Sequence, residues 1–235
     1  MMKISAKVNA IPRNIRSMHE ICGMQILVMA ATNFEIQPFI ANNKEAEILI
    51  TGVGVPATMY SLQNFLFRKN FTLVVQAGIA GSFANNIPPG EVVLVKSDTF
   101  GDIGMEEKER FVSIFESGFA DKNEFPFQDG WLQNSNAIFG ELILRSVKAI
   151  TVNKVSDSLL QREQAISSFA PQIESMEGAA LHYICLKQNI PFVQIRSISN
   201  WVGDRNKQNW KLKESISNLH QELLKLIDVV KKTTQ

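Results

Sequence analysis

Residues 175–200 read SMEGAALHYICLKQNIPFVQIRSISN, and this stretch decides the fold class. It predicts the end of one strand at Met176, a helix from Glu177 to Lys187, and a second strand from Phe192 to Ile198. An acidic residue therefore stands where the first strand gives way to the helix, and the polar cluster 196–200 stands where the second strand ends. Ligands bind outside the carboxyl ends of strands in open α/β sheets, so the stretch predicts a pocket.

The same alternation of strands and helices runs along most of the chain. We expect strands at residues 24–31, 46–51, 73–76, 91–96, 148–152 and 172–176, and helices at 34–40, 55–67 and 159–169. From Leu212 to Val230, apolar residues recur at three- and four-residue steps, which predicts an amphipathic helix packed on the core. This pattern predicts a single α/β domain with a central, mostly parallel mixed sheet flanked by helices.

The composition limits the class of protein. The chain has 235 residues, which suits one domain, and 45% of them are hydrophobic, enough for a full core. A formal net charge of +1 gives no reason to expect a nucleic acid or a membrane surface as partner, and no apolar run is long enough to cross a bilayer. Two cysteines, Cys22 and Cys185, are too few for a disulfide framework. We expect unpaired thiols in a reducing compartment and a cytoplasmic protein.

Two segments stand apart from the alternation. Residues 1–23 are unpatterned and lack the apolar core of a signal peptide, so we interpret them as a loose arm of unclear role or as residues before a later start at Met24. Residues 24–235 then form the functional domain. Residues 100–133 show little periodicity and many turn formers, so we expect a long functional loop or excursion there.

Residues 52–57, GVGVPA, match a dinucleotide-binding fingerprint because they follow a strand and open a helix. A dinucleotide-binding domain would place an acidic residue at the end of the next strand, but that strand is predicted to end in Gln76 before a glycine-rich turn at residues 77–81. We therefore favour glycines that permit a tight turn and a close backbone approach. An NAD-binding module stays open as an alternative.

The polar residues expected at strand ends suit one kind of chemistry. They are two carboxylates, an arginine, an amide and a glycine-rich loop, without a Ser-His-Asp, Cys-His or metal-ligand arrangement in the sequence. Cleavage of a glycosidic bond needs such groups, since water must be activated while an oxocarbenium-like transition state forms. Glu35 could be the base for water, and Glu177 could accept hydrogen bonds from two ribose hydroxyls. Each could also be a solvated acid in the first turn of a helix.

Six short segments together carry a resemblance to a known family. They are AATNFE (30–35), GVG (52–54), AGIAG (77–81), SDTFGD (97–102), SMEGA (175–179) and RSISN (196–200). In this order they resemble the nucleoside phosphorylase/nucleosidase superfamily, within it the methylthioadenosine/S-adenosylhomocysteine nucleosidases and the futalosine hydrolases. The resemblance implies a nucleosidase domain over residues 24–235 that hydrolyses the N-glycosidic bond of a nucleoside. It also implies no metal or cofactor, and a homo-oligomer, dimer or higher.

The resemblance implies roles for the residues expected around the sugar. Glu35 matches the carboxylate that activates water, and Arg196 matches an arginine near that water. Met176 and Glu177 match the pair that holds the ribose. The loop lining the ribose and the water is matched by Gly78, Ile79 and Ala80.

The resemblance also implies roles around the base. Val155 matches, by spacing alone, a backbone contact to the purine, with Lys154 beside it. Ser199 precedes Asn200, which matches the residue facing purine N7. Arg205, Lys207 and Lys211 are candidates for a carboxylated tail of the substrate, although each is also compatible with an ordinary solvated charge.

Asn200 is where the chain departs from the adenine-cleaving nucleosidases, which place an aspartate here. Adenine protonated at N7 offers two donors to a carboxylate, whereas hypoxanthine protonated at N7 offers one donor and one acceptor, O6, which an amide can meet. A buried mismatch leaves polar groups unpaired. Because residues 201–205 also look like the futalosine hydrolases, we expect a 6-oxopurine nucleoside such as futalosine, with release of hypoxanthine as a step of menaquinone biosynthesis.

Hydrolysis is expected rather than phosphorolysis. No arginine flanks residues 76–78, and a carboxylate near the nucleophile suits neutral water and repels a phosphate dianion. Three alternatives stay open: a methylthioadenosine nucleosidase that releases adenine, a purine nucleoside phosphorylase, and a nucleoside- or NAD-binding module without turnover.

Overall fold

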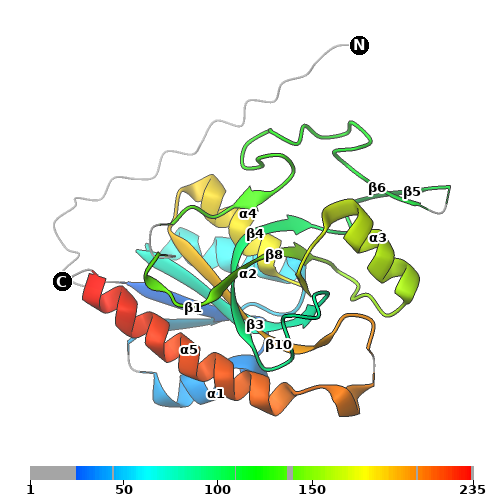
Figure 1. Ribbon diagram of the computed structural model, residues 1–235. Coiled ribbons are helices and arrows are strands. Elements are labelled where there is room, and N and C mark those ends of the chain that lie inside the picture. The colour runs from blue at the N-terminus through cyan, green and yellow to red at the C-terminus, as the bar shows by residue number, and fades with distance from the viewer. Residues whose placement is uncertain (1–24, 44, 109, 137–139, 205, 234–235) are drawn as a thin grey trace.

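A computed structural model describes residues 25–233 apart from 44, 109, 137–139 and 205. The interpretations of residues 1–23, of Cys22, of Met24 and of Arg205 concern positions outside the described residues. Within the described part, strands and helices alternate in the first and last parts of the chain as expected, whereas between residues 73 and 151 strands follow one another without an α-helix between them. Figure 1 shows the strands in the middle of the molecule with helices around them.

The first part of the chain forms three neighbouring parallel strands. Strand β1 (Ile26–Ala30) lies between β2 (Glu47–Ile50) and β3 (Leu73–Ser82). Helices α1 (Asn33–Asn42) and α2 (Val55–Arg68) are the crossovers that let these strands run in the same direction. All five residues of β1 are buried, as expected for an apolar run in the middle of a sheet covered on both faces.

The later strands close part of the sheet into a ring. They are β4 (Val92–Phe100), β8 (Arg145–Thr151), β9 (Ile173–Ser175) and β10 (Phe192–Trp201). Strand β10 is parallel to β3 and antiparallel to β4, the order continues through β8 to β9, and β9 pairs with the end of β3. The short β7 (Leu132–Gln133) adds to β4. Parallel pairs outnumber antiparallel ones, so the predicted fold class is confirmed.

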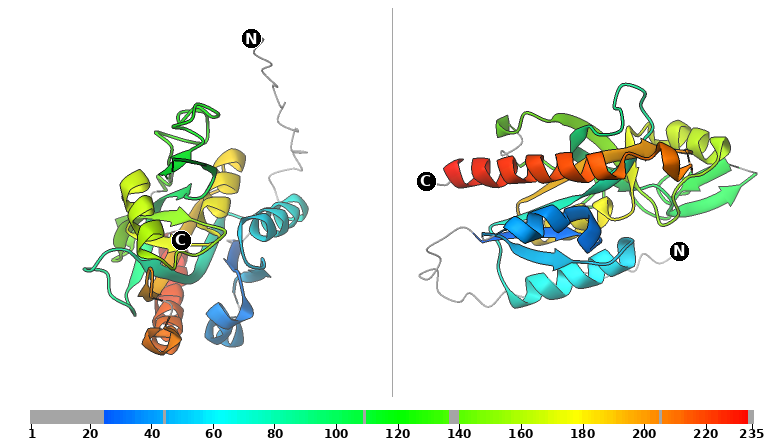
Figure 2. Two further views of the ribbon diagram at one scale, coloured as in Figure 1. Left: turned by 90° about the vertical axis from the view of Figure 1, so that its right-hand side faces the viewer. Right: turned by 90° about the horizontal axis from the view of Figure 1, so that it is seen from below.

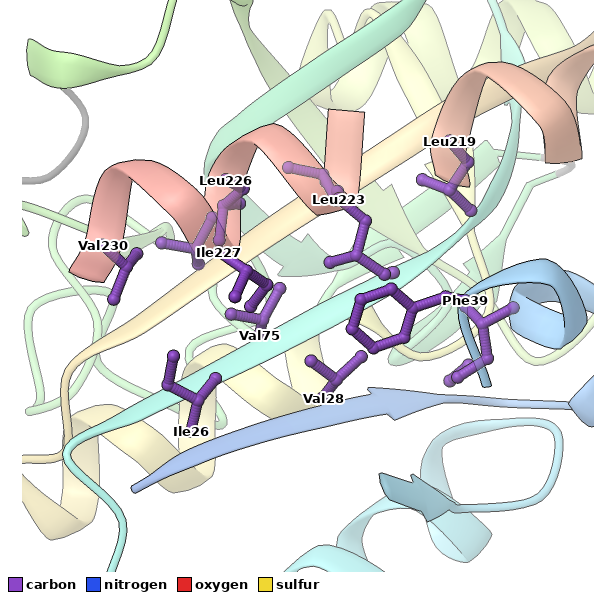
Figure 3. Close-up of a cluster of buried hydrophobic side chains, with 14 of the residues drawn as sticks. Ile26, Val28, Phe39, Val75, Leu219, Leu223, Leu226, Ile227 and Val230 are labelled. Carbon is purple, nitrogen blue, oxygen red and sulfur yellow. The ribbon is translucent and has the colours of Figure 1, made fainter. Parts of the chain in front are cut away.

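Helices cover both faces of the sheet. Helices α1 and α5 (Leu212–Thr233) bury one face, and the right-hand view of Figure 2 shows them side by side. Helices α2 and α4 (Gly178–Gln188) bury the other face. Figure 3 shows Leu219, Leu223 and Ile227 of α5 directed at the strands, which confirms the predicted stripe. Each such side chain contributes about 1.5–3 kcal/mol by leaving water. None of the described helices is long and apolar enough to cross a bilayer.

One prediction about irregular segments is wrong, and another is incomplete. Residues 77–81 are not a turn, because β3 continues through them to Ser82 and pairs with β10 along its length. Residues 100–133 contain an antiparallel hairpin of β5 (Gly104–Glu107) and β6 (Arg110–Ser113), which lies beside α3 (Leu159–Phe169) in Figure 1. Hydrogen bonds between strands stabilise both segments. Such pairing does not depend on the apolar periodicity of the local sequence.

Candidate functional site

Glu35 is held inside the protein by three hydrogen-bond donors. The backbone N–H and the hydroxyl of Thr32 each donate to Glu35 Oε2 over 3.0 Å, as in a capping box. The backbone N–H of Ile79 donates to Oε1 over 3.1 Å, so β3 and α1 together fix the carboxylate. Glu35 is 7% exposed, which excludes the interpretation as a solvated first-turn acid.

Gly78 lets two charged side chains approach the same point on β3. It lies opposite Arg196 in the register between β3 and β10. A Cβ atom at position 78 would collide with Arg196 Nη1 and would lie 2.9 Å from Glu35 Oε1. Because Gly78 has no side chain, the guanidinium and the carboxylate both approach the strand at this point.

Glu177 stands at the start of α4 and completes this cluster of charges. Its Oε1 accepts a hydrogen bond of 3.1 Å from the Gly54 N–H, and its Oε2 lies 3.5 Å from Arg196 Nη1. Gly54 has φ +88°, so the close backbone approach expected of residues 52–57 is confirmed. Glu177 is 4% exposed, and burial raises the pKa of its carboxyl against the opposing effect of Arg196. Met176 lies directly before it and is half-buried.

Asn200 lies farther along the same pair of strands, and its amide has a defined orientation. The Ser199 hydroxyl donates to Asn200 Oδ1 over 2.8 Å, and Asn200 Nδ2 donates to the Trp201 carbonyl over 2.9 Å. The amide lies over Gly81, where a Cβ atom would be 3.5 Å from Nδ2. Since Gly81 is three residues beyond Gly78, the two clusters lie about 10 Å apart along β3.

The segment that carries Val155 is hydrogen-bonded to β9 beside the cluster of Ser199, Asn200 and Gly81. Ser156 donates from its backbone N–H and its hydroxyl to the Glu174 carboxylate, both over 3.0 Å. Glu174 lies on β9 opposite Gly81, so β9 anchors Lys154 and Val155 near the same end of the site. The buried carboxylate of Glu174 is not among the site residues predicted from the sequence.

A model of the Phosphorylase superfamily matches residues 26–234. The chain belongs to the phosphorylase superfamily. It is 26% identical over 186 residues to futalosine hydrolase of Thermus thermophilus, covering 76% of this chain and 80% of that one. It is 24% identical over 236 residues to the 5'-methylthioadenosine/S-adenosylhomocysteine nucleosidase of Buchnera aphidicola, covering 96% of each chain. The resemblance of the six segments is thereby confirmed at the level of the superfamily.

Solved structures of this superfamily share the fold. The native structure of futalosine hydrolase of Helicobacter pylori has a TM-score of 0.74 at 16% identity and covers 87% of this chain and 97% of that one. A nucleosidase from the same organism, an Asp-to-Asn mutant with 5'-methylthioadenosine in the active site, has a TM-score of 0.73 at 17% identity, with coverage of 88% and 99%. At these identities the likeness concerns the fold alone.

A polar layer lies beneath the charged cluster, and we define it as Asp98, His182 and Gln194. The three side chains come from β4, α4 and β10, and none of them is accessible to solvent. Burial raises the pKa of Asp98 to about 7, against the opposing effects of Thr151 and Arg196. Burial lowers the pKa of His182 to about 4. His182 is thus a packed histidine, as its place on a helix suggests, but it belongs to a hydrogen-bonded layer.

Sequence reasoning missed this layer, although one signal was present. Gln194 and Arg196 are polar residues at alternate positions of an otherwise apolar strand, so they share one face of it. Lys207 and Lys211, the other residues considered for the substrate tail, are exposed, and Lys211 Nζ pairs with Glu214 at 3.2 Å. That is the arrangement of ordinary solvated charges. Among the described residues, no group of three or more His, Cys, Asp or Glu side chains is placed to hold a metal ion.

Proposed function

We propose that this enzyme hydrolyses the N-glycosidic bond of a 6-oxopurine nucleoside, futalosine, and releases hypoxanthine. The chain is an N-glycosyl hydrolase, the class shared by its futalosine hydrolase and nucleosidase relatives. The choice of base is the finer part of the proposal. The observation that carries it is the fixed amide of Asn200.

The hydrogen bonds of Asn200 leave it one acceptor and one donor for a base. Oδ1 accepts one hydrogen bond from Ser199 and keeps a second lone pair, while Nδ2 gives one hydrogen to Trp201 and keeps the other. A 6-oxopurine protonated at N7 matches this pair, because N7–H can donate to Oδ1 while O6 accepts from Nδ2. The amino group of adenine would place a donor against a donor, which a buried site rejects strongly.

The other cluster suits the sugar and the attacking water. The separation of about 10 Å along β3 allows one nucleoside to reach from Asn200 to Glu35 and Glu177. Glu177 can accept hydrogen bonds from the ribose hydroxyls, and Glu35, held by three donors, can take a proton from water. N7 takes up a proton from solvent, and the water oxygen bonds to C1′ as the bond from C1′ to N9 breaks. The base leaves neutral with that proton on N7, and Glu35 returns the proton it took from water to the solvent.

Assembly and location are further parts of the proposal. We expect a homo-oligomer, supported by a groove between α2 and α4 that is lined by Met59, Tyr60, Tyr183 and Ile184. Tyr60 and Phe67 of α2 are largely exposed as well, so this helix presents apolar surface for a second copy of the chain to cover. Light scattering coupled to size-exclusion chromatography tests this expectation, and a monomer at micromolar concentration contradicts it. A cytoplasmic location stays a prediction.

One assay separates the proposal from its alternatives. The protein is incubated with futalosine, inosine and methylthioadenosine, each with and without phosphate, and the released base is identified by chromatography. We expect hypoxanthine from futalosine, independent of phosphate. Release of adenine without hypoxanthine would overturn the assignment of Asn200, strict dependence on phosphate would indicate a phosphorylase, and binding without turnover would indicate a binding module.

The variant Asn200→Asp tests the donor and acceptor argument directly. The carboxylate cannot donate to O6, so kcat/KM for the 6-oxopurine nucleoside should fall by roughly tenfold to a hundredfold, while cleavage of methylthioadenosine should gain relative to it. Asn123→Asp makes the same chemical change in an exposed loop and should leave both substrates unaffected. An unchanged base preference in Asn200→Asp would contradict the argument.

A further inference from the structure

The orientation of the Gln194 amide follows from its neighbour His182. His182 Nδ1 lies 2.9 Å from the Leu132 carbonyl oxygen, which can only accept a hydrogen bond, so Nδ1 carries the proton and Nε2 is an acceptor. The amide nitrogen of Gln194 must therefore face His182, where it donates over 2.8 Å. In this orientation it also donates to Asp98 Oδ2 over 3.3 Å, and its oxygen accepts from Arg196 Nε over 3.1 Å.

This contact with Gln194 determines how the Arg196 guanidinium lies. Arg196 Nη1 faces Glu177 at the longer distance of 3.5 Å, and Nη2 has no hydrogen-bond partner among the described residues. Among the described residues, the hydrogen bond from Arg196 Nε–H to the Gln194 oxygen is therefore the shortest polar contact of the guanidinium. Because that group is planar, fixing Nε–H turns Nη1 towards Gly78 and the two carboxylates.

Asp98 occupies the far end of this chain of hydrogen bonds. Its Oδ1 accepts from the Thr151 hydroxyl over 2.9 Å, and its Oδ2 accepts the second hydrogen of the Gln194 amide. A carboxylate accepts at both oxygens, so it holds Thr151 and Gln194 at once, which an amide in its place cannot do without an unpaired donor. The described hydrogen bonds of Asp98 are to Thr151, Gln194 and the Thr99 backbone rather than to the charged cluster, and Arg196 acts on Asp98 directly only through its charge.

We propose that Asp98 is a positioning residue, which orients the Arg196 guanidinium through the amide of Gln194. The inference rests on the proposed function for the part that Arg196 plays in turnover, but the geometry of the relay can be tested without a substrate. A second route from Asp98 also exists, because Thr151 accepts the Ala179 N–H at the start of α4 over 2.7 Å. The test must therefore separate the path through Gln194 from simple support of α4.

A double-mutant cycle makes that separation. Asp98→Asn and Gln194→Met should each lower kcat by roughly tenfold to a hundredfold and change KM by less than about threefold, because a hydrogen bond to a charged group is lost. If both act through one relay, the double variant should be no slower than the slower single variant. Multiplied effects would show that Asp98 acts by another route and would overturn the proposal. Asp129→Asn, the same change at an exposed ion pair, is the control and should keep full activity.

A spectroscopic measurement tests the relay in the protein without ligand. The buried Arg196 Nε–H should give a separate nitrogen-15 resonance that is protected from exchange. In both Asp98→Asn and Gln194→Met this signal should shift and lose protection by at least tenfold, while circular dichroism shows an unchanged fold. If Asp98→Asn does not fold, Gln194→Met and the more conservative Asp98→Glu carry the same readout. An unchanged Arg196 signal in a folded variant overturns the proposal. If the signal changes as expected but no nucleoside is cleaved in any assay, only the proposed function is overturned.

Discussion

Val193 and Ile195 lie on one face of β10, Gln194 and Arg196 lie on the other, and all four side chains are almost completely buried. The first pair packs with the strands and α5 in the core shown in Figure 3. The second pair joins the polar layer and the charged cluster of the site. One strand thus separates two environments with different energetics.

The two faces of β10 differ in what burial contributes. On the apolar face, leaving water stabilises the fold directly. On the polar face, each hydrogen bond adds only about 0.5–1.5 kcal/mol net, and burying a charge carries a penalty that its partners offset in part. We infer that the apolar face supplies stability and the polar face supplies geometry. Substitutions on the two faces should therefore affect different measurements.

The largest effect is expected for Glu35→Gln. Glutamine keeps the size of the side chain but cannot take a proton from water, so kcat should fall by about 10²–10⁴-fold. Binding of hypoxanthine, measured by titration calorimetry, should stay within a few-fold of the wild type. Glu106→Gln, at an exposed position of β5, is the control and should be fully active. An active Glu35→Gln enzyme would remove Glu35 as the base.

The next effect concerns the glycine between the charges. In Gly78→Ala the new methyl group displaces Arg196 and Glu35, and a displacement of about 1 Å can lower kcat on the order of a hundredfold. Gly140→Ala adds the same methyl group where, apart from the chain neighbours, no atom of the described residues lies within 4 Å, so kinetics should not change. Equal activity of the two variants would show that the contact at Gly78 has no effect on turnover.

Substitution on the apolar face should lower stability and leave turnover intact. Leu223→Ala removes a side chain with no exposed surface, so urea denaturation should show a free energy of unfolding lower by about 2–5 kcal/mol. The kcat of the folded enzyme should match the wild type. Leu224→Ala, at the next position of α5 and 39% exposed, should cost less than about 1 kcal/mol. A large loss of kcat in Leu223→Ala would contradict the inference that the apolar face of β10 supplies stability and the polar face supplies geometry.

The smallest effect is a change in the pH dependence of stability. The pKa of His182 is about 4 in the folded protein against 6.5 in the unfolded chain, so between these values only the unfolded chain binds a proton there, and stability rises with pH. The pKa of Asp98 is about 7 against 3.8, so the folded protein holds the extra proton and stability falls with rising pH. In the wild type, the two opposite contributions to the pH dependence of stability offset each other.

His182→Gln removes one of the two slopes and keeps an acceptor for Gln194. The melting temperature of the variant relative to the wild type should therefore become lower as pH rises from about 4 to 6.5. Differential scanning calorimetry at several pH values measures this trend. A difference between the two proteins that does not vary with pH would contradict the assignment of a neutral, buried His182.

Much of the fold was predictable because the relevant signals are local. The sequence predicted helix 159–169 at its observed bounds, and the apolar stripe of residues 212–230 predicted α5. The same reasoning stopped β3 at Gln76, because glycine lowers local strand propensity and the pairing partner, β10, lies more than a hundred residues later.

The sequence by itself determined the alternation of elements, the α/β class and the polar residues available at the strand ends. Only the tertiary structure decided which of them meet. Gly54 reaches Glu177 across 123 residues, and Asp98, His182 and Gln194 come together from three separate elements. The physical reason is that side-chain periodicity is a property of neighbouring residues, whereas hydrogen-bond partners in a buried layer are set by the crossing of distant strands and helices.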